Sequence, residues 1–203
     1  MNAEQLQKTL IASQYAEQVL NLYQIQLEQD YGEDQFLQSL STENIYQKVQ
    51  DVLANLTDEQ AWMKALRALR AKLMFRWIWQ DANQLTNVVT LTRELSDFAD
   101  ASICAAKAFA LPPLLAKHGE PMGYSGQLQD LIVIGMGKLG AQELNLSSDI
   151  DLIFAFDEQG ETNGRKCIDV QQFCILWGQK LIYLLDHITA DGFVFRVDMR
   201  LRP

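Results

Sequence analysis

The segment LIVIGMGKLGAQELNLSSDIDLIFAF, from Leu131 to Phe156, decides the class of fold. It opens on a short apolar run that stops at Gly135 and closes on a second apolar run that starts at Leu152. Apolar runs of this length, bounded by glycine and polar residues, are typical of buried strands. The segment therefore predicts two strands joined by a glycine-rich turn and a polar stretch.

The residues that follow extend this pattern. Apolar residues at helical spacing predict a helix over about 168–185. Asp191-Gly192 predicts a turn, and residues 193–198 a third strand. Strand, short helix, strand, helix and strand indicate an α/β or α+β unit with a small mixed sheet. The chain stops at Pro203, directly after that last strand, so we expect a fragment whose α/β unit is incomplete.

The first half of the chain has the composition of packed helices. Up to residue 110, Gly32 is the only glycine, and the first proline is Pro112. Apolar spacing predicts one long helix ending near Tyr31-Gly32 and others over 41–53, 58–79 and 85–109, the third capped by Thr57 in a capping box. The third helix carries five basic residues, and most of them are expected to form a solvated face; they are Lys64, Arg67, Arg70, Lys72 and Arg76.

Prolines and glycines cluster between these halves and predict a linker. We therefore expect an α+β protein with a helical bundle over residues 1–110, a linker over 111–128 and an α/β core over 129–203.

Composition narrows the function. The chain has 203 residues and a formal net charge of −9, which argues against non-specific binding to nucleic acid. No apolar run approaches the roughly 18 residues of a membrane span, and the start is polar, so we expect neither a membrane partner nor a secretory signal. Three widely spaced cysteines and two histidines predict neither a disulfide framework nor a structural zinc site, and a reducing cytoplasm is the expected setting.

Residues 135–140, GMGKLG, follow the first predicted strand and open a short helix. Glycines there let the backbone approach a phosphate, the helix start offers unpaired N–H groups, and Lys138 adds a cation. A turn without a ligand is the alternative, and it is favoured for the glycines taken singly because the pattern matches neither the P-loop nor the dinucleotide fingerprint.

Asp149 and Asp151 are two residues apart, so on a strand they share a face. Such carboxylates repel each other unless a cation lies between them, which indicates Mg²⁺ with substrate phosphates. The alternative is that Asp149 caps a turn and Asp151 is solvated. Asp198, flanked by Arg196 and Arg200, fits a structural ion pair or a third metal ligand, and spacing does not decide between these.

These residues carry a resemblance. Gly137 followed twelve residues later by Asp149-Ile150-Asp151 is similar to the DNA polymerase β-type nucleotidyltransferase superfamily, which usually has Gly-Ser where this chain has Gly137-Lys138. GMGKLGAQELNLSSDIDLIFAF (Gly135 to Phe156) and DGFVFRVDMRLRP (Asp191 to Pro203) resemble the glutamine synthetase adenylyltransferase/adenylyl-removing enzyme family. LRALRAKLMFRWIWQD (Leu66 to Asp81) is similar to the helical region that precedes the family's N-terminal catalytic domain.

The resemblance implies a function. The family has two nucleotidyltransferase domains, of which the N-terminal one removes AMP from a tyrosine of glutamine synthetase and the other adds it. Met136, Asn145, Ile150 and the ending VDMRLRP are closer to the removing domain. The expected reaction is therefore phosphorolysis, in which inorganic phosphate attacks the AMP–tyrosine diester and gives ADP. The family also implies regulation by glutamine and the PII signal protein.

The resemblance further implies roles for single residues. Binding of Mg²⁺ falls to Asp149, Asp151 and Asp198, and contact with nucleotide phosphates to Gly137, Lys138 and Ser148. Arg200 and Arg202 are assigned either to the phosphates or to ion pairs with nearby acids. The helical half is implied to be scaffold or a docking face for glutamine synthetase.

Three alternatives stay open at this point. One is ATP-dependent adenylylation on the same scaffold. Another is a non-catalytic fragment that binds a nucleotide or a partner, and the third is a helical interaction module that carries the α/β part as a passenger.

Overall fold

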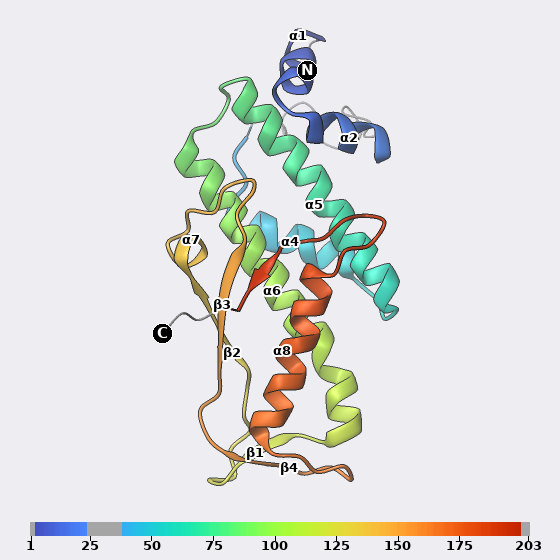
Figure 1. Cartoon of the computed structure of the whole chain (residues 1–203), viewed down its shortest axis with the longest axis vertical. Helices are drawn as coiled ribbons and strands as arrows, with labels where there is room; N and C mark the ends of the chain where they lie inside the picture. Colours follow the sequence, from blue (N-terminus) through green and yellow to red (C-terminus); the bar gives the residue numbers. More distant parts are fainter. Residues whose placement is uncertain (1–2, 24–37, 200–203) are drawn as a thin grey trace. The chain divides into compact units, whose positions relative to one another are not determined.

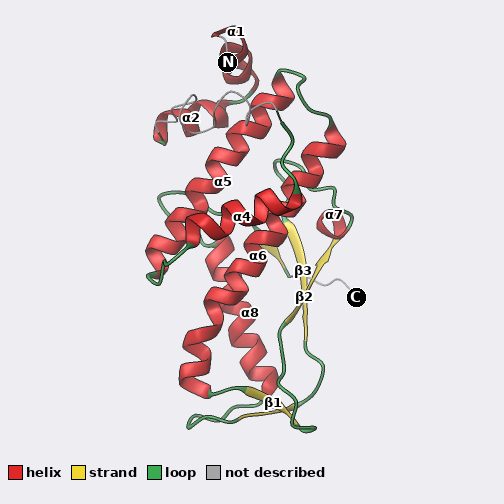
Figure 2. Cartoon of the chain, turned by 180° about the vertical axis from the view of Figure 1, so that it is seen from behind, coloured by secondary structure: helices red, strands yellow, loops and turns green. Residues whose placement is uncertain are grey.

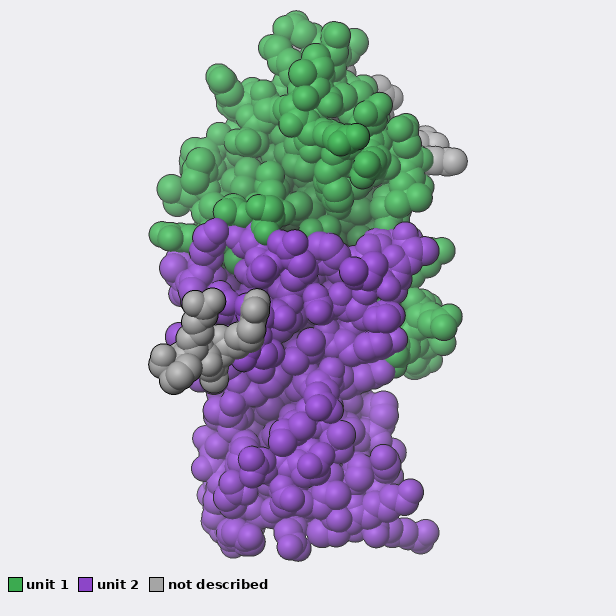
Figure 3. Space-filling model, in the orientation of Figure 1, with its two compact units in different colours: residues 1–98, 142–147 green, residues 99–141, 148–203 purple. Residues whose placement is uncertain are grey.

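The computed structural model describes residues 3–23 and 38–199 of the chain (Figure 1). It contains two compact units, coloured separately in Figure 3. The helical unit comprises residues 1–98 and 142–147, and the α/β unit comprises residues 99–141 and 148–203. The domain boundaries predicted from composition, at 110 and 128, stay a prediction.

The helical unit is built on one long central helix. Its helices are α1 (Ala3–Ala12), α2 (Gln14–Leu22), α4 (Thr42–Leu53), α5 (Glu59–Ala82) and the first part of α6 (Val88–His118). Helix α5 buries large side chains around much of its circumference, including Trp62, Phe75 and Trp77. One hydrophobic cluster of its core packs α2 against α5. It contains Ala16 and Val19 of α2 and Ala71, Phe75, Ile78 and Trp79 of α5.

Local capping decides where these helices begin. The predicted single N-terminal helix is wrong, because Ser13 ends α1 and its hydroxyl accepts a hydrogen bond from the N–H of Ala16 at the start of α2. Its predicted end near Tyr31 lies outside the described residues. Helix α4 confirms the prediction for residues 41–53. The predicted cap Thr57 is wrong, because the carboxylate of Asp58 accepts from Ala61 N instead.

Helix α6 is longer than expected and runs into the stretch predicted as a loop. It passes through Pro112 and Pro113, both exposed, and ends where Gly119 takes a positive φ of 79°. The N–H of Gly119 donates to the carbonyl of Leu115, a common glycine-terminated helix end. By length and composition alone this helix is apolar enough to cross a membrane, a test that core helices of soluble proteins also pass.

The α/β unit holds a mixed sheet with strand order β2-β3-β5. Its elements are β2 (Ile132–Met136), α7 (Gly137–Gly140), β3 (Ile150–Ala155), α8 (Val170–Asp186) and β5 (Val197–Asp198). Strand β2 pairs with β3 antiparallel, and β3 pairs with β5 parallel. The prediction of an α+β fold with a small mixed sheet is confirmed.

The third strand is much shorter than the sequence predicts. Residues 193–196 are outside it, because the N–H groups of Val194 and Phe195 both donate to the carbonyl of Leu185 in the last turn of α8. These N–H groups therefore pair with a free carbonyl at the end of a helix and not with a neighbouring strand. The turn predicted at Asp191-Gly192 is confirmed by reciprocal backbone hydrogen bonds between Thr189 and Gly192.

A second sheet was not predicted. Strand β1 (Pro121–Gly123) pairs antiparallel with β4 (Gly160–Thr162), inside and beyond the predicted linker. Each strand has only three residues and contains glycine, so neither carries the alternating apolar pattern that marks a strand in a sequence.

The two faces of the β2-β3-β5 sheet differ. Ile150 and Leu152 of β3 are buried, and the ring of Phe154 lies against Gly178 of α8, so α8 covers this face. Figures 1 and 2 show α8 on one side of β2 and β3 in both views. The opposite face exposes side chains of β2, including Ile134 and Met136.

Candidate active site

Two acidic side chains meet on the open face of the sheet. In the parallel pairing of β3 with β5, Asp151 is the register partner of Asp198. Directly paired residues on neighbouring strands project from the same face. Asp151 is exposed and Asp198 is half-buried. Residues 47 positions apart in the chain are thus adjacent on the sheet.

Asp149 continues the same row, one step before β3 begins. Its side chain forms an ion pair with Arg196, whose Nε donates to Oδ1 of Asp149. The backbone pairing brings Asp149 and Arg196 together. Ile150 N donates to the carbonyl of Arg196 at 2.9 Å, and Ile150 is the register partner of Val197. Both side chains are about half exposed, at 49% for Asp149 and 55% for Arg196.

The glycine-rich turn lies against the acidic row. Met136, the last residue of β2, is the register partner of Asp151, and Gly137 follows with a positive φ of 54°. A Cβ atom on Gly137 would lie 2.7 Å from Oδ2 of Asp151, closer than a real side chain tolerates. The positive φ favours glycine at this position, and any side chain there would make the exposed carboxylate of Asp151 move aside. Lys138, in the first turn of α7, is exposed.

Of the other predicted site residues, Ser148 is among those that the structure describes. Ser148 is half-buried and precedes Asp149 directly. Arg200 and Arg202 lie outside the described residues.

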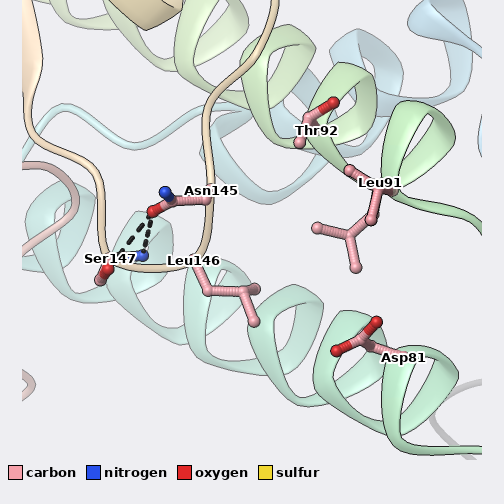
Figure 4. A pocket seen from close by; sticks show the side chains of 7 residues that line it. Asp81, Leu91, Thr92, Asn145, Leu146 and Ser147 are labelled. Atoms are coloured by element: carbon pink, nitrogen blue, oxygen red, sulfur yellow. Dashed lines mark hydrogen bonds between the residues drawn. The ribbon is translucent and has the colours of Figure 1, made fainter.

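The stretch between the turn and the acids belongs to the helical unit. In residues 142–147, Leu144 is buried and its N–H donates to Oγ of Ser96 at 3.2 Å. Figure 4 shows Asn145 accepting from both the N–H and the hydroxyl of Ser147. This loop borders a pocket of about 310 Å³ within the helical unit, lined by Asp81, Val88, Leu91, Thr92, Asn145, Leu146 and Ser147.

The acidic row has the chemistry of a magnesium site. Carboxylate oxygens are the ligands that Mg²⁺ prefers, and two of the three carboxylates are on directly paired residues. Among the described residues, no three acidic, histidine or cysteine groups are gathered as a ready metal cluster. Within the row, the carboxylate of Asp149 is directed to the guanidinium of Arg196.

A pocket adjoins this row inside the α/β unit. It has a volume of about 410 Å³ and is lined by Asp186, His187, Ile188, Phe193 and Arg196. The guanidinium of Arg196 lies 5.9 Å from the centre of the Phe193 ring, within the range of a cation–π contact. Arg196 therefore links the pocket to Asp149.

Sequence reasoning missed the partner of Asp149. The spacing of the charged residues could have indicated it. Asp149-x-Asp151 and Arg196-x-Asp198 have the same spacing, so the parallel pairing that aligns Asp151 with Asp198 also aligns Asp149 with Arg196. A solvated face was expected for most of the basic residues of α5, and it does not include Arg67 and Arg76, which are each only 1% exposed. Arg76 is paired with Glu94, an acid that the helical pattern did not single out.

Comparison with known proteins identifies the family. The family model for glutamate-ammonia ligase adenylyltransferase matches residues 3–203. The chain belongs to this family. A bifunctional glutamine synthetase adenylyltransferase/adenylyl-removing enzyme of Acinetobacter baylyi is 80% identical over 203 residues, which is 100% of this chain and 22% of the relative.

More distant relatives agree. The enzymes of the same name from Thioalkalivibrio sulfidiphilus and Pseudomonas putida are 49% and 51% identical over 156 and 152 residues, covering 77% and 74% of this chain but 16% and 15% of their own lengths. The chain thus spans about a fifth of the length of the curated relatives it matches. It is homologous to part of a nucleotidyltransferase, and the family implies a nucleotide substrate.

Proposed function

We propose that this chain carries the adenylyl-removing active site of its family and takes part in cleaving AMP from a tyrosine of glutamine synthetase by phosphorolysis. The observation that supports this most is the register of β3 and β5, in which Asp198 is the partner of Asp151. Neighbouring carboxylates on an open sheet face, next to a glycine that leaves room for one of them, suit a site for a cation and a phosphate group.

Three carboxylates would hold the divalent cations. Asp149, Asp151 and Asp198 supply oxygen ligands on one face of the sheet. Mg²⁺ bound there supplies positive charge beside oxygens that become negative as the ester bond breaks. Gly137 lies beside the carboxylate of Asp151, and Lys138 follows it in α7, so we assign both turn residues to contacts with phosphate oxygens.

Further contacts are carried over from the resemblance alone. Ser148, Arg200 and Arg202 are proposed as phosphate contacts because they stand at matching motif positions.

The reaction balances without a further reactant. An oxygen of hydrogen phosphate forms a bond to the phosphorus of the AMP–tyrosine diester, and the bond from that phosphorus to the phenol oxygen breaks. The phenol oxygen takes up the proton that the phosphate brings, which gives ADP and unmodified tyrosine. The protein has to align the phosphate with the diester and to offset the repulsion between their negative charges.

The removing reaction is preferred over adenylylation on sequence grounds. Met136, Asn145, Ile150 and the ending Val197–Pro203 resemble the removing domain of the family more than the adding domain. Glutamine synthetase as the target follows from the names of the relatives. Control by the PII signal protein and a cytoplasmic location are part of the same proposal.

The test places this 203-residue segment in the Acinetobacter baylyi relative, in place of the matching 22% of that enzyme. Adenylylated glutamine synthetase and inorganic phosphate are supplied, and ADP is measured. We expect phosphate-dependent ADP formation, and we expect Asp151→Asn to lower its rate at least about 100-fold because a charged ligand is lost.

The matched control is Asp157→Asn, an exposed acid just beyond the far end of β3. This variant should keep the rate within about twofold, as a surface substitution away from the site should. A normal rate for Asp151→Asn would refute the proposal. In a parallel assay with ATP and unmodified glutamine synthetase, pyrophosphate release that Asp151→Asn abolishes, with no ADP formed from phosphate, would assign the segment to adenylylation instead.

A further inference from the structure

The ion pair between Arg196 and Asp149 occupies part of the acidic row. Oδ1 of Asp149 accepts from Nε of Arg196, while Asp151 and Asp198 are register partners one step further along the same face. A guanidinium bound to Oδ1 of Asp149 neutralises part of the charge that a metal ion would use. Arg196 therefore competes with a divalent cation for the carboxylate of Asp149.

Arg196 borders the pocket of about 410 Å³ while it is paired with Asp149. Its guanidinium already lies 5.9 Å from the centre of the Phe193 ring, and Asp186 contributes a second carboxylate to the lining of the same pocket. The side chain of Arg196 is 55% exposed, so a turn of the guanidinium from Asp149 towards the pocket needs no repacking of a core. The contact with Phe193 can persist through such a turn, and Asp186 offers a replacement counter-charge.

We propose that Arg196 is a positioning residue that neutralises Asp149 in the metal-free protein and is exchanged for a divalent cation when the site is loaded. This inference rests on the proposed metal role of Asp149 and Asp151. The guanidinium keeps Asp149 oriented and reduces the repulsion along the row. Cation binding breaks the ion pair, and the guanidinium of Arg196 keeps its place beside Phe193 and turns towards Asp186.

The exchange makes an unusual prediction about affinity. Because cation binding must first break an exposed ion pair, removing the arginine should tighten binding. We expect Arg196→Ala to bind Mn²⁺ about two- to fivefold more tightly than the unaltered chain. Arg196→Lys keeps the charge and should stay near the unaltered affinity. An arginine with a purely structural role would do the opposite, since its loss would disorder the site and weaken binding.

The experiment is titration calorimetry of the 203-residue chain with Mn²⁺, an oxygen-seeking probe that replaces Mg²⁺. Arg165→Ala, an exposed arginine in the connection between β4 and α8, is the control for loss of a positive charge and should leave the affinity unchanged. In an Asp149→Asn background, Arg196→Ala should no longer change the affinity, because the ion pair is already absent.

Two failures are distinguishable. If Asp151→Asn does not weaken Mn²⁺ binding, the metal site and the proposed function fall, and this inference falls with them. If Asp151→Asn weakens binding but Arg196→Ala leaves it equal or weaker, the metal site stands and the exchange is refuted.

Discussion

Gly137 combines an unusual backbone conformation with a close approach to a predicted metal ligand. Its positive φ of 54° disfavours any side chain, and its missing Cβ leaves room for the carboxylate of Asp151. Gly126 separates these two effects, because its φ is +83° and nothing lies within 4 Å of a Cβ built there.

We predict that Gly126→Ala costs about 1 kcal/mol, from backbone strain alone, and leaves Mn²⁺ binding unchanged. Gly137→Ala should cost about 1–2 kcal/mol, mostly from its own positive φ, and should weaken Mn²⁺ binding, because the new methyl group displaces the carboxylate of Asp151. Urea unfolding gives the first quantity and calorimetry the second. Equal effects of the two substitutions on both quantities would show that the approach of Gly137 to Asp151 has no importance.

Cys174 differs from the other two cysteines in its surroundings. Burial raises the pKa of Cys174 to about 11, the negative charge of Asp130 adds to the increase, and Lys107 partly offsets it. Cys104 and Cys167 are exposed. A raised thiol pKa keeps the neutral form, and only the thiolate is a nucleophile.

We therefore predict that iodoacetamide at pH 8 modifies Cys104 and Cys167 at least about tenfold faster than Cys174. The rate at Cys174 should keep rising with pH up to about 11, since the thiolate fraction grows until the pH passes the pKa. Peptide mass spectrometry measures the three rates. A rate at Cys174 that levels off near pH 9 would contradict the raised pKa.

Helices α5 and α6 are joined by a buried charged network. Oε2 of Glu94 accepts from Nη1 of Arg76 and from Nε1 of Trp77, each at 2.7 Å, and Oε1 accepts from the N–H of Leu40 at 2.7 Å. Arg76 and Glu94 are almost fully buried. Arg76 also donates to the carbonyl of Gln38, so the network fixes the segment that leads into α4.

We predict that Glu94→Ala destabilises the chain by about 3–5 kcal/mol, because it leaves a buried guanidinium without its counter-charge. Glu4→Ala breaks the exposed pair with Lys8 and should cost less than about 0.5 kcal/mol. Urea unfolding of both variants provides the comparison. Similar small losses would mean that Arg76 finds another acid or water when Glu94 is removed.

The chain crosses between its two units more than once. After Ala141 it leaves the α/β unit, packs residues 142–147 into the helical unit, and returns at Ser148, next to the acidic row. Leu144 is 1% exposed there, and Leu146 packs against the cluster that contains Phe75 and Trp79. The connection between the turn and the acids is therefore part of the helical core.

We predict that Leu144→Ala costs about 2–4 kcal/mol and lowers the hydrogen-exchange protection of the α5 amides, because it opens a cavity in the helical unit. Leu128→Ala, at a position 63% exposed, is the control and should change neither quantity. Undiminished protection of α5 in the Leu144 variant would show that the loop contributes little to that core.

Much of the secondary structure was predictable because its signals are local. Helices α4 and α8 and strands β2 and β3 follow from apolar spacing and flanking caps or glycines, which act within a few residues. The motifs around Gly137 and Asp149 are local as well, so the sequence alone indicates the candidate site. Competing local signals caused the errors, as at Ser13, where a serine cap divides an apolar pattern that continues across it.

The distribution of the acidic and basic side chains depends on contacts between distant parts of the chain. The pairing of Asp198 with Asp151, the contact of Arg196 with Asp149 and the burial of Arg76 against Glu94 join residues that are 18 to 47 positions apart. No local pattern encodes such contacts, because they depend on strand register and helix packing, which minimise exposed apolar area and unpaired charge over the whole chain.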